Sequence, residues 1–435
     1  MHRPLARLRL RRPIWQFLLW VSLGLIVLAT SEVQAQRKGL PVDEPTEQPT
    51  QLALAEDLVR ALVQQGFENV AAVSEDGHVI VAYENRRYRY EIRALQEVMK
   101  LVMPRVIDDQ HVTLIPQGRG IPLVALTIPA GAYRSFMQGT MSREQFVATF
   151  IPSLGVDAFW RKTQASRKTN PSFFKFDLVI HPQFSAQFGN YDDAVKSQVN
   201  IAPELTTSFW KGMRLSAQMI IPLQNELAEE GNYLRPGLLT LNQTLRLPYN
   251  TFVSTTAGYF TLNRYGIDAA FKKYFAGGRW ALGANVGYTG EASFRKGQWL
   301  YTDPDVLTPS VSIEYYLPQY NLTARTTYGK FIFEDTGFRV DVLREFGEFK
   351  IGFYGLLSKE INNAGFNLVL PLFVRKYSKP AHVRIRPART FSWEYRYRGL
   401  PLTGRRYETG NSIDTFKEGL TPSFIKNHLT DLHNW

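Results

Sequence analysis

The chain has 435 residues, with 51 lysines and arginines against 39 acidic residues, for a formal net charge of +12. Hydrophobic residues make up 44% and charged residues 21%, which excludes an intrinsically disordered chain. A mean hydropathy of −0.22 excludes a polytopic helical membrane protein. Cysteine is absent, which excludes disulfides, thiolate metal sites and a lipidated cysteine anchor. Aromatic residues reach 13%, a content common in β-barrels with aromatic girdles.

The N-terminal segment has the layout of a secretory signal. Residues 1–13 carry five arginines and no acid, residues 14–29 are apolar, and Val33-Gln34-Ala35 fits signal peptidase. We expect a Sec-type signal peptide over residues 1–35, cleaved near Ala35. An uncleaved anchor is the alternative, although 16 apolar residues are fewer than the ~20 needed to span a bilayer. For an exported basic chain we expect anionic glycans or lipid head groups as partners, and no nucleic acid.

A linker over residues 36–50, which contains three prolines, leads into a predicted α/β region at 51–130. Apolar residues at helical spacing predict a helix ending at Gly66, and Asp76-Gly77 predicts a hairpin turn. A second helix over 92–102 and strands at 111–116 and 121–128 repeat the order. The two helix–strand–strand units resemble small periplasmic modules of outer-membrane transport proteins. A generic α/β domain is the alternative.

Residues 131–165 are predicted to be a connector with one short helix at 142–150. The basic residues near its end fit either a membrane surface or a solvated loop.

Side chains alternate with a period of two over residues 166–400. Between Trp280 and Tyr288 every second residue is apolar, so Val286 is predicted to face outward and Gly287 inward, where serine should be tolerated. A soluble sandwich and a transmembrane barrel both give such strands. Strands of about 10–14 residues, against a mode of about 5–6 in soluble proteins, and aromatic residues near strand ends favour the barrel. We therefore predict a mainly β fold: an antiparallel transmembrane β-barrel of about 12–14 strands behind a small periplasmic α/β region, with a polar C-terminal tail over 401–435.

An arginine-rich stretch over residues 371–406 concentrates the positive charge, with ten basic residues and one acid, Glu394. Arginine matches carboxylates and phosphates with its planar fork, and aromatic faces stack on sugars. The stretch therefore predicts a contact with an anionic glycan or lipid head group, although a basic loop beside acidic lipids would look the same. The candidate ligand-binding residues are Arg375, Lys376, Lys379, Arg384, Arg386, Arg389, Trp393, Arg396 and Arg398.

The segments PLFVRKYSKP (371–380) and VRIRPARTFSWEYRYRG (383–399) resemble the YjbH-like family of exopolysaccharide-biosynthesis outer-membrane proteins. The layout of signal, α/β region and amphipathic strands is similar as well. The resemblance implies a barrel in the outer membrane of a Gram-negative bacterium, acting in export or assembly of an extracellular polysaccharide or capsule, together with other export components. It implies no catalysis.

Enzyme motifs are missing from the sequence. It contains no H-E-x-x-H, G-x-S-x-G, P-loop or G-x-G-x-x-G pattern, so we expect no catalytic residues, no metal site and no cofactor. Asp177 and His181 form the best candidate pair for a barrel hydrolase, and a solvated lumenal pair is the simpler interpretation. The alternatives to polysaccharide export are a general porin or surface-structure protein, and a barrel enzyme that modifies lipid A or glycans.

Overall fold

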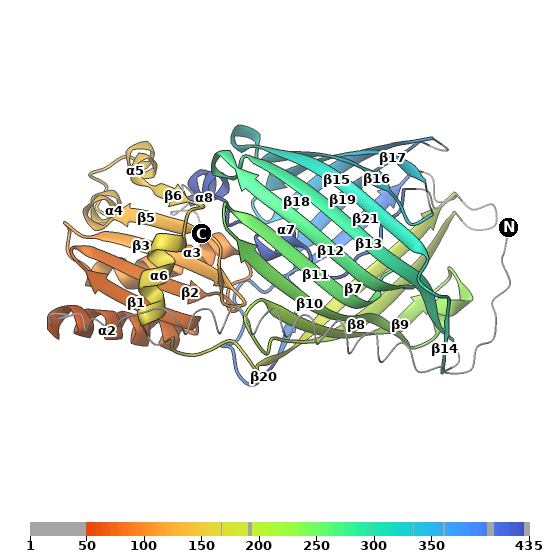
Figure 1. The fold of residues 1–435 in the computed structure, drawn as a ribbon, viewed down its shortest axis with the longest axis horizontal. Coiled ribbons are helices and arrows are strands. Elements are labelled where there is room, and N and C mark those ends of the chain that lie inside the picture. Colours follow the sequence, from red (N-terminus) through yellow and green to blue (C-terminus); the bar gives the residue numbers. More distant parts are fainter. Residues whose placement is uncertain are drawn as a thin grey trace.

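The computed structural model describes residues 49–166, 168–189, 194–295, 297–333, 335–359, 362–397 and 404–429. The predicted signal peptide, nearly all of the predicted linker and Arg398 lie outside these ranges. Figure 1 shows an α/β lobe, residues 49–166, packed against one end of a large curved sheet. Among the residues described, no helix combines the length and the apolar character needed to cross a membrane.

The lobe is a mixed sheet in the order β1-β2-β3-β5-β6, with β4 beside β3. Only the β2–β3 pair is parallel. Its helices are α2 (Pro49–Gln65), α3 (Glu91–Val102), α4 (Ala130–Met137), α5 (Arg143–Thr149) and α6 (Asp157–Ala165), with a 3-10 turn, η1, at Met103–Arg105. Its strands are β1 (Glu68–Glu75), β2 (His78–Glu84), β3 (His111–Gly118), β4 (Ile121–Pro122), β5 (Ala125–Pro129) and β6 (Ile151–Ser153).

The local signals in the first half of the lobe are confirmed. Asp76 and Gly77 both have positive φ, 47° and 73°, as a two-residue type I′ hairpin turn requires. Helix α3 buries Ile92, Leu95 and Val102 against the sheet, the face that its helical spacing predicted.

The lobe differs from the prediction in its second half. The strand expected over 121–128 is split into β4 and β5. The segment expected to be a connector instead completes the lobe, because β6 pairs with β5 and helices α4 and α5 stack Phe136 on Phe146, with ring centroids 4.5 Å apart. Short helices with few apolar residues give a weak sequence signal, and their burial depends on contacts distant in sequence.

The large sheet has 15 strands. The strands are β7 (Phe176–Phe188), β8 (Val195–Thr207), β9 (Met213–Asn225), β10 (Arg235–Leu247), β11 (Thr251–Phe260), β12 (Arg264–Phe275), β13 (Trp280–Arg295), β14 (Gln298–Tyr301), β15 (Val306–Leu317), β16 (Leu322–Lys330), β17 (Thr336–Phe346), β18 (Phe349–Ser358), β19 (Asn363–Pro371), β20 (Val383–Pro387) and β21 (Thr390–Arg396). Three 3-10 turns join strands: η2 (Glu229–Asn232), η3 (Ala276–Gly278) and η4 (Pro318–Tyr320). Neighbours along the chain pair antiparallel from β7 to β13 and from β15 to β19.

The two ends of this strand order, β20 and β21, are joined by only two residues, Ala388 and Arg389. β20 pairs parallel with β7, whereas β21 pairs antiparallel with β19. Within the described residues, β21 forms no hydrogen-bonded ladder with β7, the strand that faces it across the gap. Aromatic rings meet there instead, with 6.3 Å between the ring centroids of Phe184 and Trp393. We call this line of contact the seam.

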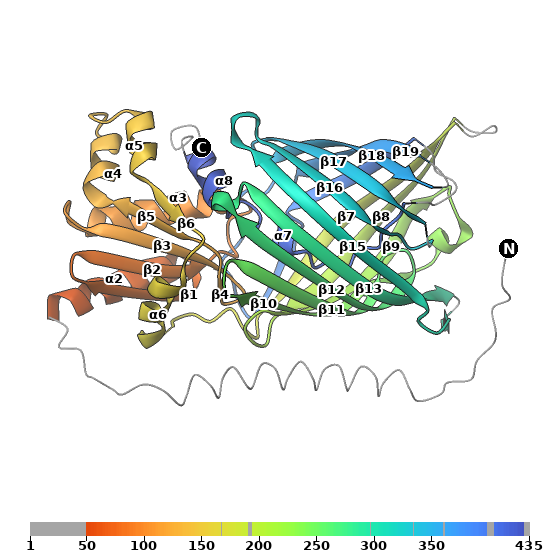
Figure 2. The ribbon, with the colours of Figure 1, turned by 45° about the horizontal axis from the view of Figure 1, so that its top comes forward.

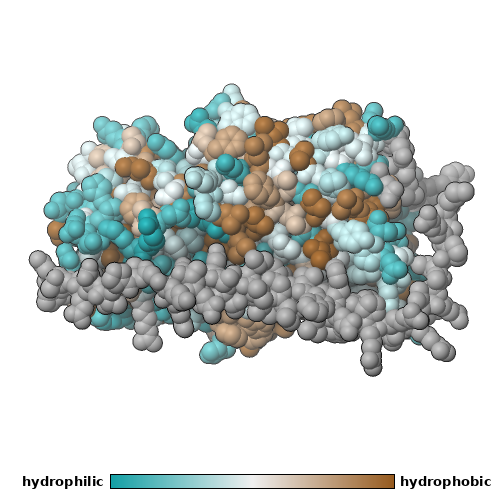
Figure 3. Space-filling model, in the orientation of Figure 1, coloured by the Kyte–Doolittle hydropathy of each residue, from teal (hydrophilic) through white to brown (hydrophobic). Residues whose placement is uncertain are grey.

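The two faces of the curved sheet are inverted relative to a soluble protein. Val286 is 47% exposed and Phe353 60% exposed on the outside, and Figure 3 shows hydrophobic residues gathered over the strands on one such face. Inside, Asn242 is fully buried and donates hydrogen bonds to Ser254 (2.8 Å) and Thr256 (2.9 Å). We call the enclosed polar space the lumen, the end beside the lobe the lobe end, and the opposite end the distal end.

The predicted polar tail is instead a strap through the lumen, residues 404–429, with helices α7 (Ile413–Phe416) and α8 (Pro422–His428) (Figure 2). At the distal end, the Gly404 N–H donates to Asp335, 2.7 Å away. At the lobe end, α8 wedges Phe424 between Tyr90 of the lobe and Tyr316 of the sheet. The polar composition of this segment predicted a solvated tail, but polar residues are equally suited to the polar lumen.

Ile425→Ala is expected to loosen α8, because Ile425 is fully buried in the joint core of lobe and strap. Such a truncation costs about 2–5 kcal/mol. Limited proteolysis of the intact protein should cleave the strap faster in this variant. Lys426→Ala, at the exposed neighbouring position, is the control and should leave the rate unchanged. Equal rates in both variants would contradict the docking of α8.

Candidate functional site

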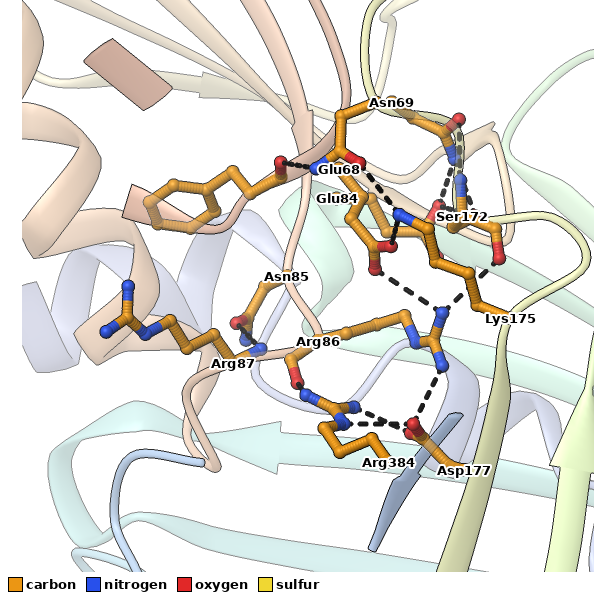
Figure 4. A network of polar contacts seen from close by, with 12 residues as sticks. Glu68, Asn69, Glu84, Asn85, Arg86, Arg87, Ser172, Lys175, Asp177 and Arg384 are labelled. Carbon is orange, nitrogen blue, oxygen red and sulfur yellow. Dashed lines mark hydrogen bonds and ion pairs between the residues drawn. The ribbon is translucent and has the colours of Figure 1, made fainter. Parts of the chain in front are cut away.

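The junction between the lobe and β7 is built around the carboxylate of Asp177 (Figure 4). Arg384 is the register partner of Asp177 in the β20–β7 ladder and reaches it at 2.7 Å. Arg386 Nε lies 3.0 Å from the same carboxylate, and Arg86 of the lobe lies 3.0 Å away. Asp177 is 2% exposed and Arg384 4% exposed. Three guanidinium groups from two parts of the fold therefore share one buried carboxylate.

A second buried acid, Glu68 of β1, continues the network. Lys175 Nζ lies 2.6 Å from Glu68, and Arg86 lies 3.4 Å away, so Arg86 connects the two carboxylates. Burial raises the pKa of Glu68 above its usual value, with Arg86 and Lys175 acting in the opposite direction. Glu84 accepts hydrogen bonds from Asn69 (2.6 Å) and Ser172 (3.2 Å) beside it.

Further contacts between the lobe and the basic stretch extend along the junction. Arg389 pairs with Glu91 of α3 at 3.1 Å, and burial raises the pKa of that carboxyl while Arg389 opposes the rise. The Tyr377 N–H donates to the Arg87 carbonyl at 2.8 Å, and the Arg89 N–H donates to the Arg375 carbonyl at 3.1 Å. The lobe and the basic stretch are therefore joined by main-chain hydrogen bonds as well as by ion pairs between side chains.

The remaining predicted ligand residues are dispersed. Arg375, Lys376 and Lys379 are exposed on the loop between β19 and β20, where Lys376 Nζ lies 5.3 Å from the ring centroid of Tyr88. Trp393 lies at the seam, and Arg396 pairs with Glu394 at 2.6 Å. Arg384, Arg386, Arg389 and Trp393 line one cavity of about 1040 Å³, where the three arginines are paired with acids that lie far away in sequence. A ligand contact of these residues stays a prediction.

The candidate functional site is therefore the lumen, to whose lining part of the arginine-rich stretch contributes. A cavity of about 690 Å³ lies inside the sheet, and one of about 1040 Å³ lies at the lobe end, where lobe residues also line it. Strap residues 408, 410–412 and 415 line both cavities. The strap thus divides the enclosed space. Sequence reasoning missed it. One feature of the sequence could have indicated the strap. The acids Asp414 and Glu418 lie close to the apolar residues Ile413 and Phe416, and a solvated tail seldom combines the two.

Ion pairs fix the strap to the wall of the lumen. Asp414 pairs with Arg325 at 2.6 Å and also with Lys272, and Glu418 pairs with Lys350 at 2.5 Å. Nearer the distal end, the Tyr407 hydroxyl donates to Asp268 at 2.8 Å, and its ring stacks on Phe260 with centroids 5.2 Å apart.

The pair considered for catalysis is not assembled. Asp177 is bound by the three arginines, while His181 lies 2.7 Å from Glu204, which also pairs with Arg214 at 3.0 Å. No cluster of three or more potential metal-binding side chains occurs within the described ranges.

Comparison with known proteins gives one family. The model described as "Exopolysaccharide biosynthesis protein YbjH" matches residues 26–367. Curated protein sequences gave no match. Among solved structures, the chain is similar to a loop L8 deletion mutant of OmpT, an outer membrane protein of Vibrio cholerae. That match has 8% identity and a TM-score of 0.24, and covers 45% of this chain and 85% of that one.

Asp177→Asn is expected to weaken the junction, because it leaves Arg86, Arg384 and Arg386 around a neutral group. Breaking a buried ion pair by removing one partner costs about 3–5 kcal/mol. Thermal unfolding of the purified protein should start at a lower temperature. Protease should also cleave the lobe of this variant faster. Asp76→Asn, on the exposed hairpin turn, is the matched control. A variant as stable as the control would show that the network is dispensable.

Gly287→Ser is expected to displace the strap, contrary to the tolerance predicted from sequence. Gly287 does face inward as predicted, but a Cβ there would collide with the Tyr407 hydroxyl and lie 2.7 Å from Thr308 Oγ1. Gly355→Ser is the control, because nothing lies within 4 Å of its added Cβ. A spin label on the strap should become more mobile only in the first variant. An unchanged spectrum there would contradict the packing of Tyr407.

Proposed function

Because the chain belongs to the exopolysaccharide biosynthesis protein YbjH family, we propose that it is an outer-membrane β-barrel acting in export or assembly of an extracellular polysaccharide. The match over residues 26–367 is the observation that carries this proposal. It spans the lobe and most of the large sheet, and it ends before the basic stretch over 371–406 that first suggested the family.

The inverted faces of the sheet support the membrane part of the proposal. Soluble monomers rarely expose contiguous apolar patches larger than a few hundred Å². Here alternate residues of successive strands, such as Leu282, Val286 and Ile313, are exposed, while the opposite face is polar and enclosed. Aromatic residues are exposed near both ends, including Tyr249 and Tyr320 at the lobe end and Phe188 and Trp299 at the distal end. That is the arrangement of a barrel that faces lipid.

Connection lengths favour one orientation. Most turns at the lobe end are short, as at 248–250 and 347–348, and the exception is 372–382, which packs against the lobe. The distal end carries the longer connection 226–234 and the β14 excursion over 296–305, beside a short turn at 261–263. Outer-membrane barrels have short periplasmic turns and longer outer loops. We therefore place the lobe in the periplasm, where it is available to other components of the export system.

A general porin is less well supported, because the strap crosses the space through which solutes would diffuse. We also propose a non-catalytic role, since His181 and Asp177 are engaged with separate partners. The functional test is deletion of the gene in a producing strain, with measurement of cell-bound and released polysaccharide and complementation in trans. Unchanged polysaccharide would overturn the proposal.

Val286→Arg is expected to impair assembly of the barrel, because it places a charge on the outer face near the middle of β13. The cost at a bilayer midplane is about 2–4 kcal/mol and falls to about 0–1 kcal/mol near the interface. Tyr249→Arg, at the exposed rim, is therefore the control. The fraction of protein that resists unfolding by detergent at room temperature, and then shifts on gels after heating, measures assembly. Equal assembly of both variants would argue against a lipid-facing sheet.

A further inference from the structure

Two consecutive arginines of the strap, Arg405 and Arg406, have no carboxylate partner among the residues that the structure describes. Arg406 donates to Ser310 Oγ at 2.9 Å and to Asn285 Oδ1 at 3.4 Å, both of which are neutral. The Nε atom of Arg405 is buried without a hydrogen-bond partner. Buried polar groups are nearly always satisfied, so an unpartnered guanidinium nitrogen calls for an explanation.

Other arginines of the same wall are paired. Arg339 lies 2.8 Å from Asp341, Arg396 lies 2.6 Å from Glu394, and Arg325 pairs with Glu314 as well as Asp414. These three wall arginines each have an acid within reach. The two strap arginines do not, and neither does Arg235 of β10, which donates to main-chain carbonyls.

The backbone around them is held firmly. Arg405 accepts a hydrogen bond at its carbonyl from the Ile332 N–H (3.2 Å), and the Glu408 N–H donates to Thr261 Oγ1 (2.7 Å). Together with the bond from Gly404 to Asp335, these contacts fix the main chain on both sides. These contacts position the main chain that carries the two arginine side chains.

Arg405 lines a further cavity, of about 780 Å³, at the distal end of the lumen beside the seam. The other charged groups in its lining are Arg235, Arg295, Arg396, Glu230 and Glu394. Both acids are already paired, Glu230 with Arg295 and Glu394 with Arg396. Arg235 donates only to main-chain carbonyls, so the cavity keeps two unneutralised cations, Arg235 and Arg405.

The next cavity inward is mixed in charge, because Asp268 and Glu408 also line it. Arg406 lines the 690 Å³ cavity, and Arg396 and Glu394 line both that cavity and the distal one. With the lobe in the periplasm, an exported chain would therefore meet Arg406 first and then Arg235 and Arg405 near the distal end. Cavities of these sizes are in the range of ligand pockets, and Tyr259 and Trp393 add aromatic surface to the distal one.

We propose that Arg405 and Arg406, with Arg235 beside them, form a binding site for the carboxylate groups of an acidic saccharide. The guanidinium fork matches a carboxylate with two parallel hydrogen bonds, and an enclosed site with unpaired cations attracts anions strongly. The location inside the lumen favours a glycan chain over a lipid phosphate, which would approach from the outer surface. This inference rests on the proposed function and specifies its substrate as a uronate-containing polysaccharide.

The test is calorimetric titration of the purified full-length protein in detergent with an oligogalacturonate of five sugars. Maltopentaose, which is neutral, and inorganic phosphate are titrated in parallel. We expect the acidic oligosaccharide alone among the sugars to bind, more weakly as salt rises. The double variant Arg405→Gln/Arg406→Gln should bind it at least about tenfold more weakly, a factor that corresponds to ~1.4 kcal/mol. Lys426→Gln, on the exposed face of α8, should bind like the parent protein.

Equal binding by the double variant and the parent, or no binding of oligogalacturonate by the parent, would overturn the site. Binding of phosphate without oligogalacturonate would also overturn it in favour of a lipid phosphate. The gel shift of the double variant on heating shows that it still assembles. The titration is independent of gene deletion: polysaccharide lost on deletion with no oligogalacturonate bound refutes only the site, whereas the reverse pair of results refutes only the proposed export role.

Discussion

The alternation of side chains along long strands is the constraint on which the rest of the structure depends. With one face apolar and exposed, every polar and charged residue of the opposite face is directed into a common enclosed space. Most charges there are paired, because burial of an unpaired ion is costly. Lys272 and Arg325 alone would overload one part of the wall with positive charge, and Asp414 of the strap supplies a second acid beside Glu314. The strap is therefore part of the electrostatic balance of the lumen.

The same reasoning explains why the lobe and the sheet meet through ions and apolar residues together. Buried ion pairs add little net stability compared with apolar packing, but they are very sensitive to position. The Asp177 cluster thus fixes how the lobe sits against β7, while the apolar contacts of Phe424 and Ile425 supply cohesion. Arg86 of the lobe pairs with Asp177 of the sheet, and Lys175 pairs with Glu68 of the lobe, so a shift of the lobe would break both contacts at once.

Local structure could be predicted from the sequence, whereas contacts between residues far apart in the chain could not. The hairpin at Asp76-Gly77 and the inward direction of Gly287 followed from turn chemistry and periodicity, which act over a few residues. The acidic partners of Arg384 and Arg389 could not be predicted in this way, because Asp177 and Glu91 lie more than 200 residues away. A basic residue in a sequence does not show whether an acid will pair with it in the fold. The position of the strap inside the lumen could not be predicted for a related reason. A polar segment that fills a polar lumen has the composition of a solvated tail, and no periodic pattern separates the two.

The strap also limits how a polymer could use the lumen. Its two ends are held differently: α8 is packed in the apolar core at the lobe end, whereas residues 404–411 are held mainly by hydrogen bonds to the polar wall. Segments held by solvent-accessible polar contacts open at lower free energy than those packed in a core. Passage through the lumen would therefore begin with movement of the distal part while α8 stays in place. In that part lie Arg405 and Arg406, so an acidic chain that bound them would compete with the contacts that position the strap.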